Sequence, residues 1–153
     1  MSNVLSFAIG QAFAGRGTAY VYVLYSKEQH VLYVGQTHQR GGPLQRLGQH
    51  LGNFGTFRYR IYDHDGIELE DITDLALIAL PLPDDPAYRS ESPTYREGVE
   101  YLLQKRIESD GVTWQPYFYL VSEVEAVTTT TLREIQEIAD RFYNVVEALY
   151  QLP

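Results

Sequence analysis

Two tyrosines, an arginine and a histidine stand at spacings that suit the chemistry of phosphate esters. Tyr22 and Tyr33 lie eleven residues apart in two short apolar segments, and Arg46 and His50 follow at positions i and i+4, on one face of a predicted helix. Arginine carries a forked positive charge that matches the non-bridging oxygens of a phosphate. A tyrosine can orient or deprotonate a water if a cation lowers its pKa from about 10. Histidine can assist the proton transfer or bind phosphate, so these residue types together favour hydrolysis of a phosphodiester.

The two tyrosines are predicted to lie on neighbouring strands of a hairpin. Residues 19–25 are β-branched and aromatic throughout, and residues 31–35 form a second short run of the same kind. The residues between the two runs are polar and form a turn, so the two strands are expected to pair directly. The second run leads into Gly35-Gln36-Thr37.

A helix is predicted at 43–51, because Pro43 suits a first helical turn and Gly52 follows the last one. The apolar stripe of this helix consists of Leu44, Leu47 and Leu51. On a helical wheel Arg46 and His50 point well away from that stripe. We therefore expect both side chains to be free to meet a ligand rather than to enter the core.

This order of residues resembles the GIY-YIG nuclease superfamily. The first family motif corresponds to Tyr20-Val21-Tyr22, with tyrosine in place of the first glycine, and the second corresponds to Tyr33-Val34-Gly35. The family helix carries an arginine followed four residues later by a histidine, as Arg46 and His50 do here. The resemblance covers roughly residues 19–117 and implies an α/β fold, in which a small mixed or antiparallel sheet is flanked by helices.

The resemblance also implies a metal-binding glutamate on a later helix, which residues 95–109 can supply. The buried stripe of that helix is predicted from Val99, Leu102, Leu103 and Ile107. On a helical wheel Glu97 and Glu108 project to solvent opposite this stripe, whereas Glu100 sits at its edge and can face a cleft beside the sheet. The family pattern, a glutamate followed by apolar residues, also matches Glu100. We therefore expect Glu100 to be the metal ligand.

The function that the resemblance implies is cleavage of phosphodiester bonds by a metal-dependent endonuclease, with DNA as the expected substrate. The implied cofactor is one divalent ion, Mg²⁺ or Mn²⁺, which keeps much of its hydration shell. The implied catalytic residues are Tyr22, Tyr33, Arg46, His50 and Glu100, and members of the family differ in which tyrosine activates the water. The implied substrate-binding residues are Gly35, Gln36, Thr37, Arg40 and Gln115, the last in place of the family's asparagine.

Further elements are predicted along the rest of the chain. Apolar residues that recur between positions 4 and 13 predict an N-terminal helix. Strands are predicted at 57–62, 75–82 and 114–121, of which 75–82 is expected to be a central strand of the sheet. A tight turn is predicted at 63–66 and a polar loop at 84–93. The chain, 1–153, is expected to be a single domain with a catalytic core at 19–117 and a C-terminal extension at 118–153.

The C-terminal extension ends in a long amphipathic helix at 131–150. Its apolar stripe consists of Leu132, Ile135, Ile138, Phe142, Val145 and Leu149. Such a stripe must be buried somewhere. It can pack on the sheet of its own chain, or it can form a homodimer in which two copies pair through this helix.

The composition suits one compact domain and excludes several other classes of protein. The chain has 153 residues, 44% of them apolar, and no cysteine, so disulfide frameworks, zinc–thiolate sites and thiol catalysis are excluded. No apolar run is long enough to cross a bilayer. No basic residue precedes the N-terminal apolar stretch, as a secretory signal normally requires, so a cytoplasmic protein is expected.

The charge is distributed unevenly along the chain. Residues 1–60 contain six basic residues and one acidic residue, a net charge of +5. Residues 61–153 contain six basic and nineteen acidic residues, a net charge of −13. The protein is acidic overall, at −8, yet such an asymmetric chain can present a cationic face to a nucleic acid.

Two other functions are compatible with the same residues. One is a catalytically inactive member of the fold that binds nucleic acid or protein, which the acidic second part of the chain, Tyr20 and the missing asparagine favour. The presence of all four central catalytic residue types counts against it. The other is a toxin or defence nuclease held in check by a partner, because acidity would limit indiscriminate binding to DNA.

Overall fold

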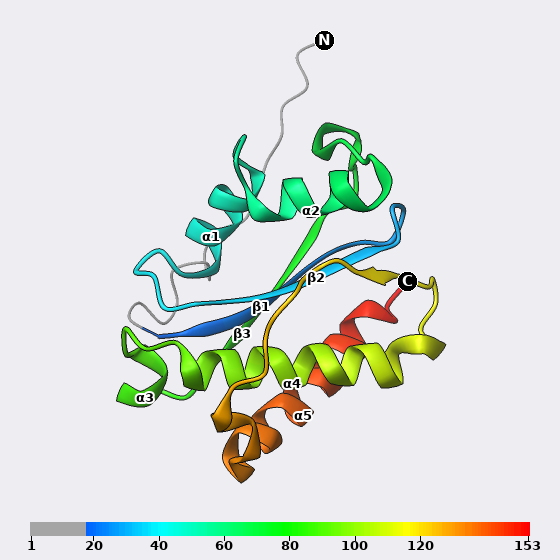
Figure 1. The fold of residues 1–153 in the computed structure, drawn as a ribbon. Helices are drawn as coiled ribbons and strands as arrows, with labels where there is room; N and C mark the ends of the chain where they lie inside the picture. The colour runs from blue at the N-terminus through cyan, green and yellow to red at the C-terminus, as the bar shows by residue number, and fades with distance from the viewer. Residues whose placement is uncertain (1–17) are drawn as a thin grey trace.

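The computed structural model describes residues 18–153, and the helix predicted between positions 4 and 13 lies outside them. One sheet contains β1 (Tyr20–Ser26), β2 (Val31–Thr37), β3 (Ala76–Pro81) and β4 (Tyr119–Leu120), in the order β3-β1-β2-β4 (Figure 1). β1 runs antiparallel to β2 and β3, whereas β4 runs parallel to β2. The chain is therefore α/β with a mixed sheet.

Helices cover both faces of this sheet (Figure 1). On one face lie α1 (Gly42–Leu51) and α2 (Thr56–Asp65), and on the other lie α4 (Thr94–Asp110) and α5 (Arg133–Tyr150). The shorter elements are α3 (Pro86–Arg89), η1 (Leu69–Asp71), η2 (Gly111–Thr113) and η3 (Thr128–Thr131). Because both faces are covered, β1 and β2 are buried at nearly every position rather than at alternate ones.

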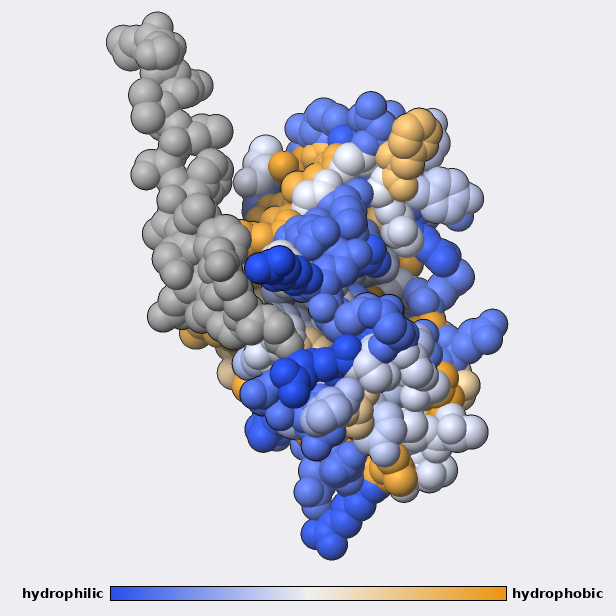
Figure 2. Space-filling view, turned by 90° about the vertical axis from the view of Figure 1, so that its left-hand side faces the viewer, coloured by the Kyte–Doolittle hydropathy of each residue, from blue (hydrophilic) through white to orange (hydrophobic). Residues whose placement is uncertain are grey.

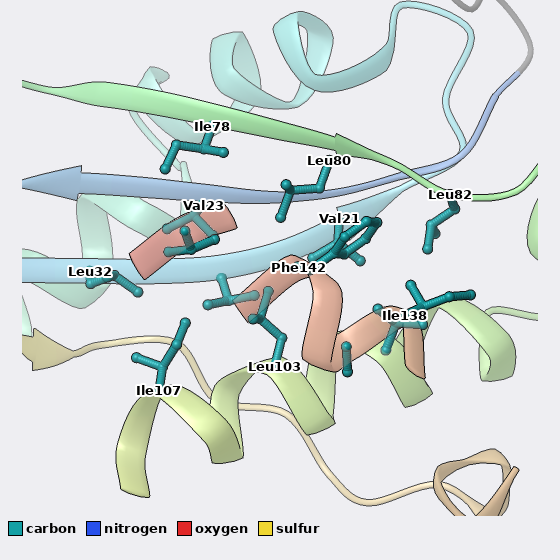
Figure 3. Close-up of a cluster of buried hydrophobic side chains, with 14 of the residues drawn as sticks. Val21, Val23, Leu32, Ile78, Leu80, Leu82, Leu103, Ile107, Ile138 and Phe142 are labelled. Atoms are coloured by element: carbon teal, nitrogen blue, oxygen red, sulfur yellow. The ribbon is translucent and has the colours of Figure 1, made fainter. Parts of the chain in front are cut away.

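Each face of the sheet has its own hydrophobic core. Val21 and Val23 of β1 pack with Leu103 of α4 and Phe142 of α5 (Figure 3). The residue between the two valines, Tyr22, belongs to the second core, under α1 and α2. Successive side chains of a strand point to opposite faces, so the tyrosines of the candidate site fall on the α1 side of the sheet.

Several predicted elements are confirmed. The hairpin pairs with Tyr22 opposite Gly35 and with Tyr33 opposite Leu24. The helix predicted at 43–51 is α1, which has proline in its first turn, and the helix predicted at 95–109 is α4. The strand predicted at 75–82 is β3, but the expectation that it is central is wrong, because β3 lies at the edge of the sheet.

The strand predicted at 57–62 is wrong, because these residues belong to helix α2. Phe57 and Ile61 are fully buried and lie four positions apart, about one helical turn. Tyr59, between them, is more than half exposed, so the alternation in the sequence does not separate two faces of a strand. The turn predicted at 63–66 is the end of α2, which stops at Gly66 in the left-handed conformation.

The strand predicted at 114–121 is reduced to the two residues of β4. Trp114 is fully buried, packs against Tyr150 of α5, and donates a hydrogen bond from Nε1 to Glu147 at 3.1 Å. Side-chain packing rather than strand pairing therefore holds the start of this segment. Pairing with β2 begins only at Tyr119.

Helix α5 buries its apolar side within its own chain. Ile135, Ile138 and Phe142 of the predicted stripe belong to the core formed with α4 and the sheet. The buried side continues through Ala139, Val146 and Tyr150, whereas Leu132, Val145 and Leu149 are more than a third exposed. The extension 118–153 thus supplies both a strand and part of the core. A homodimer through α5 stays a prediction, and it would have to use the exposed residues.

The surface around α1 and α3, on the left-hand side of Figure 1, faces the viewer in Figure 2. Hydrophilic residues cover most of this face, and hydrophobic ones appear in separate spots (Figure 2). None of the helices in residues 18–153 combines the length and the apolar character needed to cross a membrane.

Candidate active site

Tyr22 of β1 and Tyr33 of β2 lie side by side on the face of the sheet that α1 and α2 cover. They belong to the same core, and their ring centroids are 6.4 Å apart in a stacked arrangement. Burial raises the pKa of both hydroxyls above its usual value. The positive charge of Arg46 opposes this rise for both tyrosines.

Gly35 lies opposite Tyr22 in the hairpin and makes room for its ring. A Cβ atom on Gly35 would overlap the hydroxyl oxygen and Cζ of Tyr22. The glycine after Tyr33-Val34 therefore has a steric explanation, because the end of the Tyr22 side chain sits directly over it.

His50 of α1 is 1% exposed and packs against both tyrosines, so the expectation that it stays clear of the core is wrong. Its two ring nitrogens have separate partners. Nδ1 accepts a hydrogen bond from the backbone N–H of Phe57 at 3.2 Å, and Nε2 lies 2.6 Å from the hydroxyl of Tyr22. Because Nδ1 is an acceptor, Nε2 carries the proton of the neutral ring. Nε2–H therefore donates a hydrogen bond to the Tyr22 oxygen.

This arrangement determines what His50 can do for Tyr22. Burial, and then the charge of Arg46, lower the pKa of His50 to about 4, so its ring is neutral near pH 7. The Tyr22 oxygen receives a hydrogen bond from the ring, and its own O–H is left for another acceptor. His50 therefore stabilises negative charge on the Tyr22 oxygen and does not take the Tyr22 proton.

Arg46 is the partly exposed cation of this cluster. Its Nη1 donates to Oε1 of Gln49 at 2.8 Å, while its buried Nε has no hydrogen-bond partner among the described residues. The guanidinium is close enough to Tyr22, His50 and Glu100 to shift their pKa values. A buried donor without a partner is uncommon in proteins.

Glu100 of α4 approaches the same tyrosines from the other side of the sheet. It is 8% exposed, and burial, followed by the charge of Glu97, raises the pKa of its carboxyl to about 8, whereas Arg46 acts in the opposite direction. Glu100 in turn raises the pKa of Tyr22 and Tyr33. The prediction that Glu97 projects to solvent is wrong, because Glu97 is partly buried and acts on Glu100.

The two layers of the molecule meet at the part of β2 that β4 leaves uncovered. β4 pairs no further along β2 than Leu32. Further along the same edge of β2, the backbone N–H of Val34 donates a hydrogen bond to Oγ of Ser122 at 3.0 Å. Gly35 follows and has no side chain. Groups from α1 and from α4 can therefore approach one another around this edge.

Three polar residues of α4 form a buried row beside the apolar stripe. Arg96, Glu100 and Gln104 stand four positions apart, and each is more than nine-tenths buried. Nε2 of Gln104 has no hydrogen-bond partner among the described residues. The sequence reasoning missed Arg96 and Gln104. The signal that could have found them is the regular i, i+4, i+8 spacing, which puts all three on one face of the helix.

Three of the expected substrate-binding residues lie near the cluster, between the end of β2 and the start of α1. Gln36 is partly exposed at the end of β2. Thr37 is buried, and its hydroxyl accepts the backbone N–H of Gln39 at 3.1 Å. Arg40 is exposed in the loop before α1. Of these side chains, Gln36 and Arg40 are the ones that solvent or a ligand can reach.

Gln115 is not brought to the cluster. The carbonyl of its neighbour Pro116 accepts the hydroxyl of Tyr150 at 3.0 Å, which ties this segment to the end of α5. The next residue, Tyr117, stacks on His30 in the turn between β1 and β2. That turn is the end of the hairpin farthest from Gly35-Gln36-Thr37, so Gln115 is not in place to serve as the amide of this site.

The cationic first part of the chain is partly neutralised in the fold. Arg58 pairs with Glu70 at 2.8 Å, and Arg60 pairs with Glu123 at 2.6 Å. Both carboxylates come from the acidic second part of the chain. Among the described residues of this first part of the chain, Arg40 and Arg46 form no ion pair, so their positive charge is not neutralised in this way.

The donor set of the cluster fits a hydrated divalent ion. Nowhere in residues 18–153 do three histidine, aspartate or glutamate side chains gather closely enough to hold a metal by themselves. Glu100, however, is a buried carboxyl that forms neither an ion pair nor a hydrogen bond with the described residues, so its ionised form would be stabilised by a bound cation. Mg²⁺ keeps several waters and is often held by one or two carboxylates, so the residues present fit this ion.

Comparisons of the chain with protein-family models, with curated proteins and with solved structures found no match. The interpretation of this site therefore depends on its own geometry and chemistry.

Proposed function

We propose that this protein is a metal-dependent endonuclease of the GIY-YIG type that hydrolyses phosphodiester bonds in DNA. The observation that supports this function is the convergence of Tyr22, Tyr33, Arg46, His50 and Glu100 from both layers of the molecule. The cluster combines a cation for non-bridging oxygens, a hydroxyl that lies within hydrogen-bond distance of a histidine and near an arginine, and a carboxyl without a counter-ion. These are groups that phosphodiester hydrolysis uses.

In this proposal Tyr22, rather than Tyr33, orients and activates the attacking water. Burial raises the pKa of Tyr22, but its oxygen accepts the Nε2–H of His50 and lies near the charge of Arg46, and both act against that rise. Burial raises the pKa of Tyr33 strongly, and the proximity of Tyr22 and Glu100 adds to that rise. Tyr22 would thus orient the water, and in its phenolate form it would accept the water's proton, while Tyr33 would hold the rings of Tyr22 and His50 in place.

Arg46 and Glu100 would handle the charge of the phosphate. The guanidinium of Arg46 would bind the non-bridging oxygens and stabilise the negative charge that grows on them in the transition state. Glu100 would hold the Mg²⁺ or Mn²⁺ ion, which when bound acts as a Lewis acid and stabilises the departing oxygen.

The proposed function is tested by incubating the purified protein with plasmid DNA, single-stranded DNA and RNA in the presence of Mg²⁺, Mn²⁺ or EDTA. We expect nicked and linear plasmid with either metal and intact plasmid with EDTA. Cleavage of RNA alone would keep the chemistry and change the substrate. Binding of DNA without cleavage in every condition would contradict the proposal and favour a non-catalytic nucleic-acid-binding module.

Arg46→Lys is expected to lower kcat by about 10- to 100-fold and to weaken DNA binding only modestly. Lysine keeps the positive charge but loses the planar fork that holds two oxygens at once. Steady-state kinetics on a labelled DNA duplex measure the effect. Arg133→Lys, at an exposed ion pair on α5, is the control and should behave like the wild type. Full turnover by Arg46→Lys would show that Arg46 acts only as a general positive charge.

Gly35→Ala is expected to lower kcat by about 100-fold or more, because the new methyl group pushes Tyr22 away from His50 and small displacements of reacting groups are costly. Circular dichroism should show that the variant still folds. Gly48→Ala is the matched control, since Gly48 lies on α1 with nothing near the position of its Cβ. That variant should keep full activity. Undiminished cleavage by Gly35→Ala would contradict the placement of Tyr22 over Gly35.

A further inference from the structure

Arg96 at the start of α4 is a cation that the fold buries without a carboxylate partner. It is 1% exposed, and its Nη1 donates to the backbone carbonyls of Tyr88 at 2.6 Å and Ser90 at 2.7 Å. Its Nε donates to Oε1 of Gln36 at 2.8 Å. All three acceptors are neutral, and none of the ion pairs in the described part of the chain includes Arg96. Burying an unpaired charge costs free energy, so this position calls for an explanation beyond the loop contacts.

The contact with Arg96 determines how the amide of Gln36 is oriented. An arginine Nε–H can only donate, so the atom of Gln36 that faces it is the carbonyl Oε1 and not the nitrogen. Nε2 of Gln36 is then left with its two N–H groups, and this side chain is partly exposed. Gln36 therefore presents hydrogen-bond donors to any group that approaches the edge of β2.

Gln36 stands beside the place where a substrate would lie. It directly follows Gly35, over which the Tyr22 hydroxyl sits. Strand alternation puts Gln36 on the α4 side of the sheet, where Arg96 is one helical turn from Glu100. A strand of nucleic acid that passed around this edge of β2, with one phosphate at the tyrosines, would bring an adjacent phosphate to the Gln36 side.

We propose that Gln36 donates a hydrogen bond to the phosphate next to the scissile one, and that Arg96 is the positioning residue that turns the Gln36 amide nitrogen toward it. The buried charge of Arg96 adds to the attraction for an anionic strand on this side of the sheet. The inference rests on the proposed function, because it names a substrate contact at the same site.

Gln36→Glu separates this role from a purely structural one. The new carboxylate would pair with the guanidinium of Arg96, so the variant should melt at a higher temperature than the wild type. The same change removes the amide donors and places negative charge beside the phosphate. Affinity for a fluorescein-labelled DNA duplex, measured in EDTA, should therefore fall by about 10- to 100-fold. Gln151→Glu makes the same change at an exposed position just after α5, and it should alter neither quantity.

Two results with Gln36→Glu would overturn the inference. A variant that melts higher and binds DNA as tightly as the wild type would show that Arg96 and Gln36 serve the fold alone. A variant that melts lower would show that the residue at this position does not face the guanidinium.

A double-mutant cycle tests whether Arg96 acts through Gln36. Arg96→Lys keeps the charge but loses the Nε–H donor, so KM for cleavage should rise several-fold while kcat changes little. In a Gln36→Ala background the same substitution should have no further effect on KM. An equal effect in both backgrounds, or a loss of thermal stability alone, would show that Arg96 only holds the segment at Tyr88 and Ser90.

These measurements also distinguish the inference from the proposed function. If the wild type binds DNA and never cuts it, the proposed nuclease activity is wrong. The affinity of Gln36→Glu then still reports whether Gln36 contacts the DNA. If the wild type cuts DNA and Gln36→Glu binds and cuts it equally well, only the inference fails. If the wild type neither binds nor cuts nucleic acid, both are overturned.

Discussion

Replacing Glu100 with glutamine is expected to abolish cleavage and, at pH 8, to make the protein more stable than the wild type. The substitution removes the negative charge that would hold the divalent ion, so we expect kcat to fall by at least about 1,000-fold, or ~4 kcal/mol of transition-state stabilisation. Glutamine keeps the shape of the side chain and removes a buried, unpaired charge, which costs the fold free energy. Activity and stability should therefore change in opposite directions.

The gain in stability should depend on pH. Burial, and then Glu97, raise the pKa of the Glu100 carboxyl from 4.5 to about 8 in the folded protein. Below pH 4.5 the carboxyl is protonated in both the folded and the unfolded chain. As the pH rises from 4.5 to 8, the unfolded chain releases this proton and the folded protein keeps it, so the wild type loses stability. The melting temperatures of Glu100→Gln and the wild type should be similar at pH 4.5 and differ most at pH 8 and above.

Glu108→Gln is the matched control for this prediction, because Glu108 is exposed near the end of the same helix. It should change neither cleavage nor the pH dependence of the melting temperature. The melting curves require EDTA, since a bound ion would stabilise the wild type selectively. Remaining activity in Glu100→Gln would contradict its assignment as the metal ligand. Equal melting temperatures at pH 8 would contradict the picture of a buried carboxyl without a partner.

Tyr22→Phe is expected to lower kcat by about 100- to 10,000-fold, the range associated with loss of a general base. The change removes the oxygen that accepts the Nε2–H of His50, which is also the group proposed to activate the water. The ring and its packing over Gly35 are kept, so the variant should fold. Single-turnover cleavage of a labelled duplex at saturating enzyme measures the chemical step directly.

Tyr33→Phe is the matched comparison for Tyr22→Phe. Tyr33 contacts His50 and Phe57 with its ring, edge to face, and phenylalanine keeps those contacts. We expect the rate to fall by less than about 10-fold. A larger loss in Tyr33→Phe than in Tyr22→Phe would reverse the assignment of the two tyrosines.

The fold was predictable where local signals agree with one another. Two β-branched runs around a polar turn specify the hairpin, and Pro43 and Gly52 bound α1. Helix α2 was not predictable in this way, because residues 57–61 alternate apolar and basic side chains as a half-buried strand would. The burial of Phe57 depends on contacts with Tyr33, which is distant in the sequence, and with His50, which lies across the turn between α1 and α2.

The residues of the candidate site could be chosen from the sequence, but their surroundings could not. The helical wheel separated His50 from the leucines of α1. It could not show that the tyrosines of the sheet enclose His50 from the other side. Arg96 was overlooked because an arginine near the start of a helix is usually solvated. It is buried here because the chain around Tyr88 and Ser90 folds back over it.

The division of the cluster between the two layers has a consequence for how the protein is made. Tyr22 and His50 leave the ribosome early, whereas Glu100 takes its place only once α4 has docked on the sheet. Helix α4 in turn packs closely on the segment that follows it, because a Cβ atom on Gly98 would come within 3.2 Å of Ile135. A growing chain therefore has no complete cluster until α5 has emerged and folded. The proposed nuclease activity would therefore be confined to folded molecules and absent from nascent fragments.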